Sequence, residues 1–323
     1  MQEITLHYPE SWRTALNRHA EQVELRTLEW ARQTGLVQAA SLEFDRLRFL
    51  RAGYFGGYAY PDAGRPELQA ICDFLAAWLL LDDHLEFALP MLEDHERSET
   101  CSSYMEALST GLATPDADGF ERAFAEVGRR LKAMSVTPTW YRFLTSMVDY
   151  FEGVLAEISA HEVDRVVGRR RYLGFRAHAA GAYPVLDLIE AAYAYVIPLD
   201  LRDSPKMIAL REHYANVICH ANDIASHSKD IELGTANMVV VLQHEGLAVA
   251  AALGETARLH DEAVAEFDAL AHAIEVERNH DPQVVTHLAH IRTLARGLLE
   301  WQLRASRYQT LESGRWLSVA RQR

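Results

Sequence analysis

The chain of 323 residues has few of the residues that interrupt or cross-link a fold. It contains 17 glycines, 10 prolines and three cysteines, and no stretch of low complexity. The cysteines are Cys72, Cys101 and Cys219, an odd number with no pair at metal-ligand spacing, which argues against a disulfide framework. We therefore expect a chain that is folded throughout except at short flexible ends, with buried thiols in a reducing, cytoplasmic setting.

Long apolar runs are also missing. The run 74–81 has eight residues, whereas a helix that spans a bilayer needs about 20. The N-terminal residues lack the basic start and apolar core of a signal peptide. We expect no membrane span and no secretion signal.

Positive charge is scarce, since 32 Lys and Arg residues face 46 Asp and Glu residues for a formal net charge of −14. This balance argues against nucleic acid as a partner, because a phosphate backbone is bound through basic side chains. A small polyanionic substrate would need local cations or metal ions.

What the chain has is helical periodicity. Hydrophobic residues make up 49 %, enough for a sizeable core, and strand-like alternation is nearly absent. No repeat, linker or composition shift divides the chain, so we expect one all-α domain over 1–323. The predicted helices cover residues 12–33, 65–87, 97–111, 118–134, 139–160, 183–196, 204–230, 246–276 and 282–308.

The first chemical feature follows a helix that is apolar on nearly every side, residues 71–81. Such a helix belongs in the centre of a protein, yet it leads directly into Asp82, Asp83 and Glu86. Asp82 and Glu86 share a helix face and Asp83 lies about 100° round, so their charges repel unless a cation compensates. A metal site is one interpretation, and a solvated acidic helix end is the other.

The second feature is the spacing of Asn222, Ser226 and Asp230, each four residues from the next. This spacing aligns their side chains along one helix stripe. An amide oxygen, a hydroxyl and a carboxylate suit Mg²⁺ and leave room for phosphate oxygens. Lys229 could reach the same phosphates. Taken alone, the stripe would be an ordinary polar face.

Together these features resemble bacterial class I terpene synthases. The Asp82 to Glu86 segment is similar to that family's aspartate-rich motif, and the Asn222 to Asp230 segment to its second metal motif. Arg307 and Tyr308 resemble the pair near the family's C-terminus. Further segments agree in order and spacing along nearly the whole chain: 17–21, 28–30, 59–63 and 237–239.

The resemblance implies a helical bundle around a central apolar cavity and a Mg²⁺-dependent terpene cyclase with three metal ions. The substrate would be a linear isoprenyl diphosphate, by default farnesyl diphosphate, with geranylgeranyl diphosphate as the alternative. Family members are often antiparallel dimers, so a homodimer is left open. The implied metal ligands are Asp82, Asp83, Glu86, Asn222, Ser226 and Asp230, and the implied diphosphate-binding residues are Arg176, Lys229, Arg307 and Tyr308.

Two further site features come from the same resemblance. Arg176 matches the family's diphosphate-sensing arginine, and residues 179–181 match the helix break that follows it. Trp78 and Trp301 are placed to stabilise a passing carbocation with their ring faces, although ordinary core packing would also explain both. These two tryptophans and Arg176 are the predicted catalytic residues.

One residue departs from the family pattern, because Asp230 stands where a glutamate is usual. Its side chain is one methylene shorter, so either its helix lies closer to the metal or a water bridges the gap. Two other functions stay open at this point. One is a chain-elongating prenyltransferase of the same helical fold, and the other is a non-catalytic helical protein that binds an isoprenoid.

Overall fold

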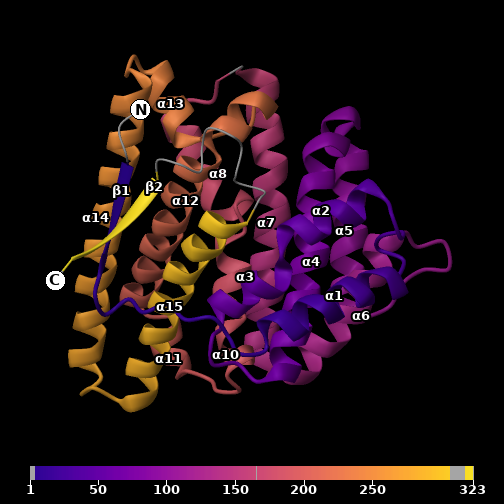
Figure 1. The fold of residues 1–323 in the computed structure, drawn as a ribbon, viewed down its shortest axis with the longest axis horizontal. Helices are drawn as coiled ribbons and strands as arrows, with labels where there is room; N and C mark the ends of the chain where they lie inside the picture. Colours follow the sequence, from indigo (N-terminus) through magenta and orange to yellow (C-terminus); the bar gives the residue numbers. More distant parts are fainter. Residues whose placement is uncertain (1–3, 165, 306–316, 323) are drawn as a thin grey trace. The chain divides into compact units, whose positions relative to one another are not determined.

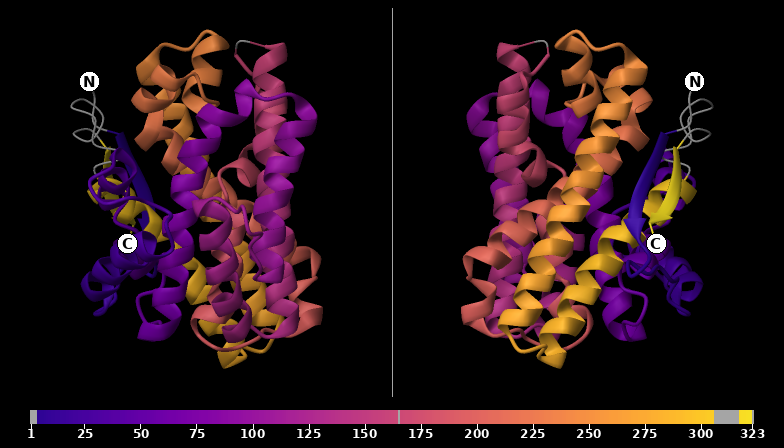
Figure 2. Two further views of the ribbon diagram at one scale, coloured as in Figure 1. Left: turned by 90° about the vertical axis from the view of Figure 1, so that its right-hand side faces the viewer. Right: turned by 90° about the vertical axis from the view of Figure 1, so that its left-hand side faces the viewer.

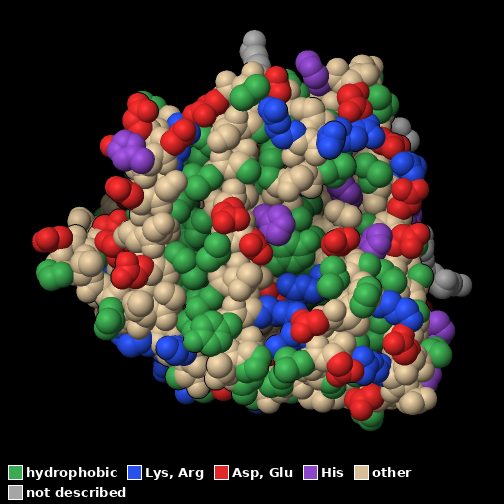
Figure 3. Space-filling model, turned by 180° about the vertical axis from the view of Figure 1, so that it is seen from behind, with side chains coloured by type: hydrophobic (Ala, Val, Ile, Leu, Met, Phe, Trp, Pro, Cys, Tyr) green, Lys and Arg blue, Asp and Glu red, His purple; other side chains and the backbone are tan. Residues whose placement is uncertain are grey.

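The computed structural model describes residues 4–164, 166–305 and 317–322 (Figure 1). Helices dominate these ranges, which confirms the predicted all-α fold class. None of the helices in these ranges combines the length and hydropathy that crossing a bilayer requires. On the face shown in Figure 3, acidic and basic side chains are interspersed with hydrophobic ones.

The chain forms two compact units, which we name after the motif that each contains. The first-motif unit comprises Ala15–Phe151 and Asp187–Val196. The second-motif unit comprises Met1–Thr14, Glu152–Leu186 and Ile197–Arg323.

The first-motif unit is built from α-helices and one short 3-10 helix around a central helix, α4. The helix α4 (Arg65–Ala88) begins with Pro66 in its first turn and contacts α1, α3 and α6. Every residue from 70 to 81 is buried, so the predicted central helix is confirmed. The other elements are α1 (Ala20–Gln33), α2 (Leu42–Leu50), α3 (Ala52–Ala59), η1 (Leu89–Met91), α5 (Asp94–Thr110), α6 (Gly119–Met134), the first part of α7 (Thr137–Val163) and α10 (Ile189–Ala192).

A buried carboxylate ties three of these helices together. Asp73 on α4 is 1 % exposed and accepts hydrogen bonds from Thr27 Oγ1 at 2.6 Å and Arg130 Nη1 at 2.8 Å. Burial alone raises the pKa of Asp73, while Arg130 and the hydrogen bonds oppose this effect. The network fixes α1 and α6 against α4, because a buried charge must keep its partners.

The predicted helix 12–33 starts later than expected. Asn17 is buried and its amide donates to the carbonyl oxygens of Tyr60 and Ala63, at 3.0 and 2.9 Å. The same amide accepts from the backbone N–H of His19. These bonds hold the chain in a turn, so α1 begins only at Ala20.

The second-motif unit is also helical, with one pair of strands. Its long helices α12, α14 and α15 contact one another. The helices are the second part of α7, α8 (Arg169–Ala179), most of α9 (Ala182–Asp187), α11 (Leu199–Arg202), α12 (Pro205–Leu233), α13 (Met238–His244), α14 (Val249–Glu277) and α15 (Pro282–Arg304). The predicted helix 282–308 thus ends at Arg304, and residues 306–308 lie outside the described ranges.

The strands were not predicted. The strands β1 (Ile4–Pro9) and β2 (Leu317–Gln322) pair in parallel, with Ile4 opposite Leu317. The strand β1 lies along α14 (Figures 1 and 2). Side chains alternate between buried and half-buried along β1. Tyr8 OH lies 2.9 Å from His260 Nε2, so a contact distant in sequence fixes this short strand.

The predicted helix 183–196 is instead broken into α9 and α10. Two buried acidic side chains flank the break, and both contact α7. Asp187 accepts a hydrogen bond from Ser146, and Glu190 Oε2 lies 3.4 Å from Thr139 Oγ1. The helices α2, α3, α8, α11 and α13 were also missed, because short helices carry little periodicity and depend on tertiary packing.

A close approach of α3 to α1 generates a pH-dependent prediction. A Cβ on Gly53 would lie 2.5 Å from the backbone nitrogen of Glu24, so only glycine fits there. Glu24 accepts from Gly53 N–H at 2.7 Å, and burial raises the pKa of Glu24 to about 7. The folded chain therefore binds a proton at Glu24 more tightly than the unfolded chain does.

We expect the Glu24 contribution to stability to be full below pH 4.5 and to be lost as pH rises through 7. Glu24→Gln removes this titration. The quantity to follow is the free energy of unfolding of Glu24→Gln minus that of the unaltered chain, both measured in urea. This difference should increase by roughly 2 kcal/mol from pH 5 to pH 8. A constant difference between the two chains across this range would contradict the prediction.

Candidate active site

The first motif occupies the last two turns of α4. Asp82, Asp83 and Glu86 are all half-buried there, as expected for a helix that leaves the core. The fully buried Tyr150 of α7 donates its hydroxyl proton to Asp82 Oδ1 at 2.8 Å. Burial raises the pKa of Tyr150, and the Asp82 charge raises it further, so the phenol stays a donor. Tyr150 therefore fixes the orientation of Asp82.

Trp78, one turn before Asp82, lies within an aromatic cluster. Its ring stacks on Phe74 with centroids 5.9 Å apart and meets Tyr150 edge-on at 5.3 Å. Trp78 is 4 % exposed. These contacts amount to core packing, and its role toward a carbocation stays a prediction.

The second motif lies on α12. Ser226 Oγ is 2.8 Å from the carbonyl oxygen of Asn222 and 2.5 Å from Asp230 Oδ2, so its single proton serves one acceptor at a time. Asp230 is buried, and burial raises its pKa while Ser226 and Asn237 act against this effect. The structure thus brings two of the three predicted ligands into direct contact on one stripe.

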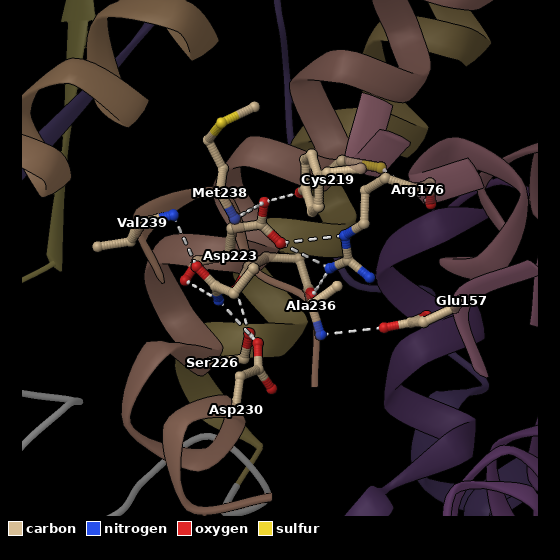
Figure 4. Close-up of polar contacts among 12 residues, drawn as sticks. Glu157, Arg176, Cys219, Asp223, Ser226, Asp230, Ala236, Met238 and Val239 are labelled. Carbon is tan, nitrogen blue, oxygen red and sulfur yellow. Dashed lines mark hydrogen bonds and ion pairs between the residues drawn. The ribbon is translucent and has the colours of Figure 1, made fainter. Parts of the chain in front are cut away.

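Asp223, which the sequence did not single out, is the centre of this unit's polar network (Figure 4). It is fully buried, and its Oδ1 accepts from Arg176 Nε and Nη2 at 3.1 and 2.7 Å. Its Oδ2 accepts from the hydroxyl of Tyr172 and, at 3.1 Å, from the backbone N–H of Met238. Asp223 thereby joins α8, α12 and α13.

Arg176, the predicted diphosphate sensor, is held by this network. Its Nη2 also donates to Asn222 Oδ1 at 2.7 Å, so it touches a predicted metal ligand directly. Burial would lower the pKa of Arg176, but the Asp223 charge raises it well above the ordinary value. The guanidinium is a permanent, oriented cation beside the second motif.

The helix break after Arg176 is confirmed. The helix α8 ends at Ala179, Gly181 has φ +63°, and α9 starts at Ala182. Ala180 N–H donates to the Arg176 carbonyl oxygen, and Gly181 N–H to that of His178. A left-handed residue at this point favours glycine.

Of the remaining predicted site residues, the structure describes Lys229 and Trp301. Lys229 is half-buried on α12, and its charge partly opposes the rise that burial causes in the pKa of Asp230. Trp301 is 3 % exposed near the end of α15. Arg307 and Tyr308 lie outside the described residues.

The donor atoms suit a hard divalent cation, because both motifs present oxygen alone. Within the described ranges, no three His, Cys, Asp or Glu side chains converge on one point.

The sequence missed Tyr150, Tyr172 and Asp223 as site residues and used 237–239 only as a marker of resemblance. The sequence does mark two of these positions. Asp223 lies inside the second motif, and Asn237 directly precedes a short apolar run. No sequence pattern marks Tyr150 or Tyr172, because each reaches its partner across the tertiary fold.

The Arg176–Asp223 pair gives a stability prediction. Asp223→Ala leaves the guanidinium of Arg176, whose side chain is only 12 % exposed, without its carboxylate, so the free energy of unfolding should fall by about 3–5 kcal/mol. The control is Asp164→Ala, which removes the exposed partner of Arg171 and should cost less than about 1 kcal/mol. Denaturant titration of both variants measures the difference, and equal losses would refute it.

Comparisons with known proteins agree with this geometry. One relative is the pristinol synthase of Streptomyces pristinaespiralis, 28 % identical over 91 % of this chain and 82 % of the relative. Another is a sesquiterpene synthase of Metarhizium acridum, 26 % identical over 90 % and 83 %. The crystal structure of the linalool/nerolidol synthase of Streptomyces clavuligerus, in complex with 2-fluorogeranyl diphosphate, has the same fold. Its TM-score is 0.79, at 22 % identity over 92 % of this chain and 98 % of that one.

A family model adds the decisive finding. The model of terpene synthase family 2, C-terminal metal binding, matches residues 73–266, from Asp73 on α4 to Glu266 on α14. That span is more than half of the chain and includes both motifs and Arg176. The chain therefore belongs to the metal-binding terpene synthases of this family.

Proposed function

We propose that this chain is a Mg²⁺-dependent sesquiterpene cyclase that converts farnesyl diphosphate into a cyclic hydrocarbon or alcohol. As a terpene synthase it is a lyase that releases diphosphate from an isoprenyl diphosphate. We infer the metal, the substrate length and the roles of individual residues, and we infer that residues 1–323 form one catalytic domain.

One observation supports the proposal most strongly. On α12, Ser226 and Asp230 are in direct contact, and the side-chain oxygen of Asn222 accepts a hydrogen bond from the half-buried cation of Arg176. An oxygen-only donor set beside a permanent positive charge suits a metal–diphosphate complex. A merely solvated polar face would not bury Asp230 or Asp223.

The residues would hold Mg²⁺ through Asp82, Asp83 and Glu86 of the first motif and Asn222, Ser226 and Asp230 of the second. Three ions are expected with substrate. When bound, Mg²⁺ stabilises the negative charge that develops on the leaving diphosphate.

The chain's own cations act in the same direction. Arg176 and Lys229, with Arg307 and Tyr308 by resemblance, bind diphosphate oxygens as the carbon–oxygen bond breaks. The bonding electron pair leaves with the diphosphate, so an allylic cation remains. Cyclisation and loss of a proton, or capture of water, then complete the reaction.

The cation has to react before bulk water reaches it. We propose Trp78 and Trp301 as the aromatic groups that stabilise it through their ring faces. Trp78 is the better supported, since Phe74 and Tyr150 fix its ring one turn from Asp82.

The substrate length rests on the relatives, because the Metarhizium protein is named a sesquiterpene synthase. The test is incubation with geranyl, farnesyl, geranylgeranyl and geranylfarnesyl diphosphates and Mg²⁺, followed by gas chromatography. Cyclic C15 products support the proposal. A longer diphosphate would indicate chain elongation, and unchanged substrate a binding protein. EDTA should abolish turnover and added Mg²⁺ restore it.

We also propose that the enzyme works in the cytoplasm. The three cysteines are unpaired and buried, which suits a reducing compartment. Fractionation of cells that express the chain tests this.

Asp82→Ala should lower turnover of farnesyl diphosphate by at least about a hundredfold, because it removes a metal ligand that Tyr150 orients. The fold should remain, since Asp82 is half-buried at the end of α4. The control, Asp116→Ala, removes an exposed carboxylate of the same unit and should leave turnover unchanged. Full activity of Asp82→Ala, with circular dichroism like that of the unaltered chain, would refute the metal role.

A further inference from the structure

We propose that Asn237 is a positioning residue for Asp230, and that it compensates for the short carboxylate at this position of the second motif. The inference rests on the proposed function, because it assumes that Asp230 binds metal. Asn237 lies between α12 and α13 and is fully buried.

The side chain of Asn237 makes three hydrogen bonds. Its Nδ2 donates to Asp230 Oδ2 at 2.7 Å and to the carbonyl oxygen of Asp223 at 2.8 Å. Its Oδ1 accepts from Val239 N–H at 2.9 Å and so caps α13. Both N–H donors and one lone pair of Oδ1 are used in this orientation, so the amide cannot rotate without losing a buried bond.

These bonds give the two carboxylate oxygens of Asp230 different environments. Oδ2 is taken by Asn237 and Ser226, whereas Oδ1 makes no hydrogen bond to any part of the chain that the structure describes. Asp230 is thus prepared as a ligand through one oxygen.

The length of the side chain explains why the position needs this support. A glutamate has one more methylene and can extend toward a metal by rotation about its own bonds. Asp230 cannot extend, so the direction of its carboxylate has to be fixed by its neighbours. Partners that orient metal ligands typically contribute 10- to 100-fold to metal affinity.

The test is Mn²⁺ binding by electron paramagnetic resonance, in the presence of inorganic diphosphate and without isoprenoid substrate. Asn237→Ser keeps a capping oxygen but is too short to reach Asp230. We expect its Mn²⁺ affinity to fall by about 10- to 100-fold. Asn237→Thr, which fills more of the site, replaces it if the serine variant does not fold.

A double-mutant cycle with Asp230→Ala shows whether Asn237 acts through Asp230. In that background the first motif still binds Mn²⁺, and Asn237→Ser should change the affinity by less than about twofold. A loss that persists undiminished would overturn the inference, as would an unchanged affinity of Asn237→Ser alone.

A matched control separates positioning from stability. Thr256 on α14 is fully buried and its hydroxyl donates to the Ala252 carbonyl oxygen, so Thr256→Ala also removes a buried hydrogen bond. It should lower the melting temperature without changing Mn²⁺ affinity, and an equal loss of affinity in this control would overturn the inference. If the unaltered chain binds no Mn²⁺ with diphosphate, the proposed metal site itself fails.

Discussion

The second-motif unit depends on one buried carboxylate. Asp223 is fully buried and accepts four hydrogen bonds, two of them from Arg176, one from Tyr172 and one from the backbone of Met238. A charge in this position is tolerated because it is paired and completely hydrogen-bonded. Since its donors come from α8 and α13, the same bonds that satisfy Asp223 also set the positions of both elements against α12.

This constraint links structure to chemistry. The cation that Asp223 holds is Arg176, which also donates to Asn222 Oδ1, a proposed metal ligand. On the other side of the network Asn237 bonds both the Asp223 backbone and Asp230. The proposed ligands are thus supported by Arg176, which is also proposed to bind diphosphate, and by Asn237, which makes no proposed contact with substrate. Metal sites commonly need such support, because an unsupported ligand loses precision.

The first-motif unit applies the same principle in a simpler form. Asp73 is buried on α4 and held by Thr27 and Arg130, and farther along the same helix Asp82 is held by Tyr150. The first carboxylate fixes helices against one another, whereas the second is half-buried and proposed to bind metal. Two acidic side chains on one helix therefore differ in role because their burial differs.

The sequence by itself determined the all-α fold class, the central helix that leads into Asp82 and the family to which the chain belongs. These features are local, since they follow from periodicity and from motifs within single helices. Only the tertiary structure decided that Asp223, Tyr150 and Asn237 support the motifs, that α1 begins after Asn17 and that β1 pairs with β2. The physical reason is that each depends on a hydrogen bond between residues that folding brings together, and such bonds leave no periodic signal in the sequence.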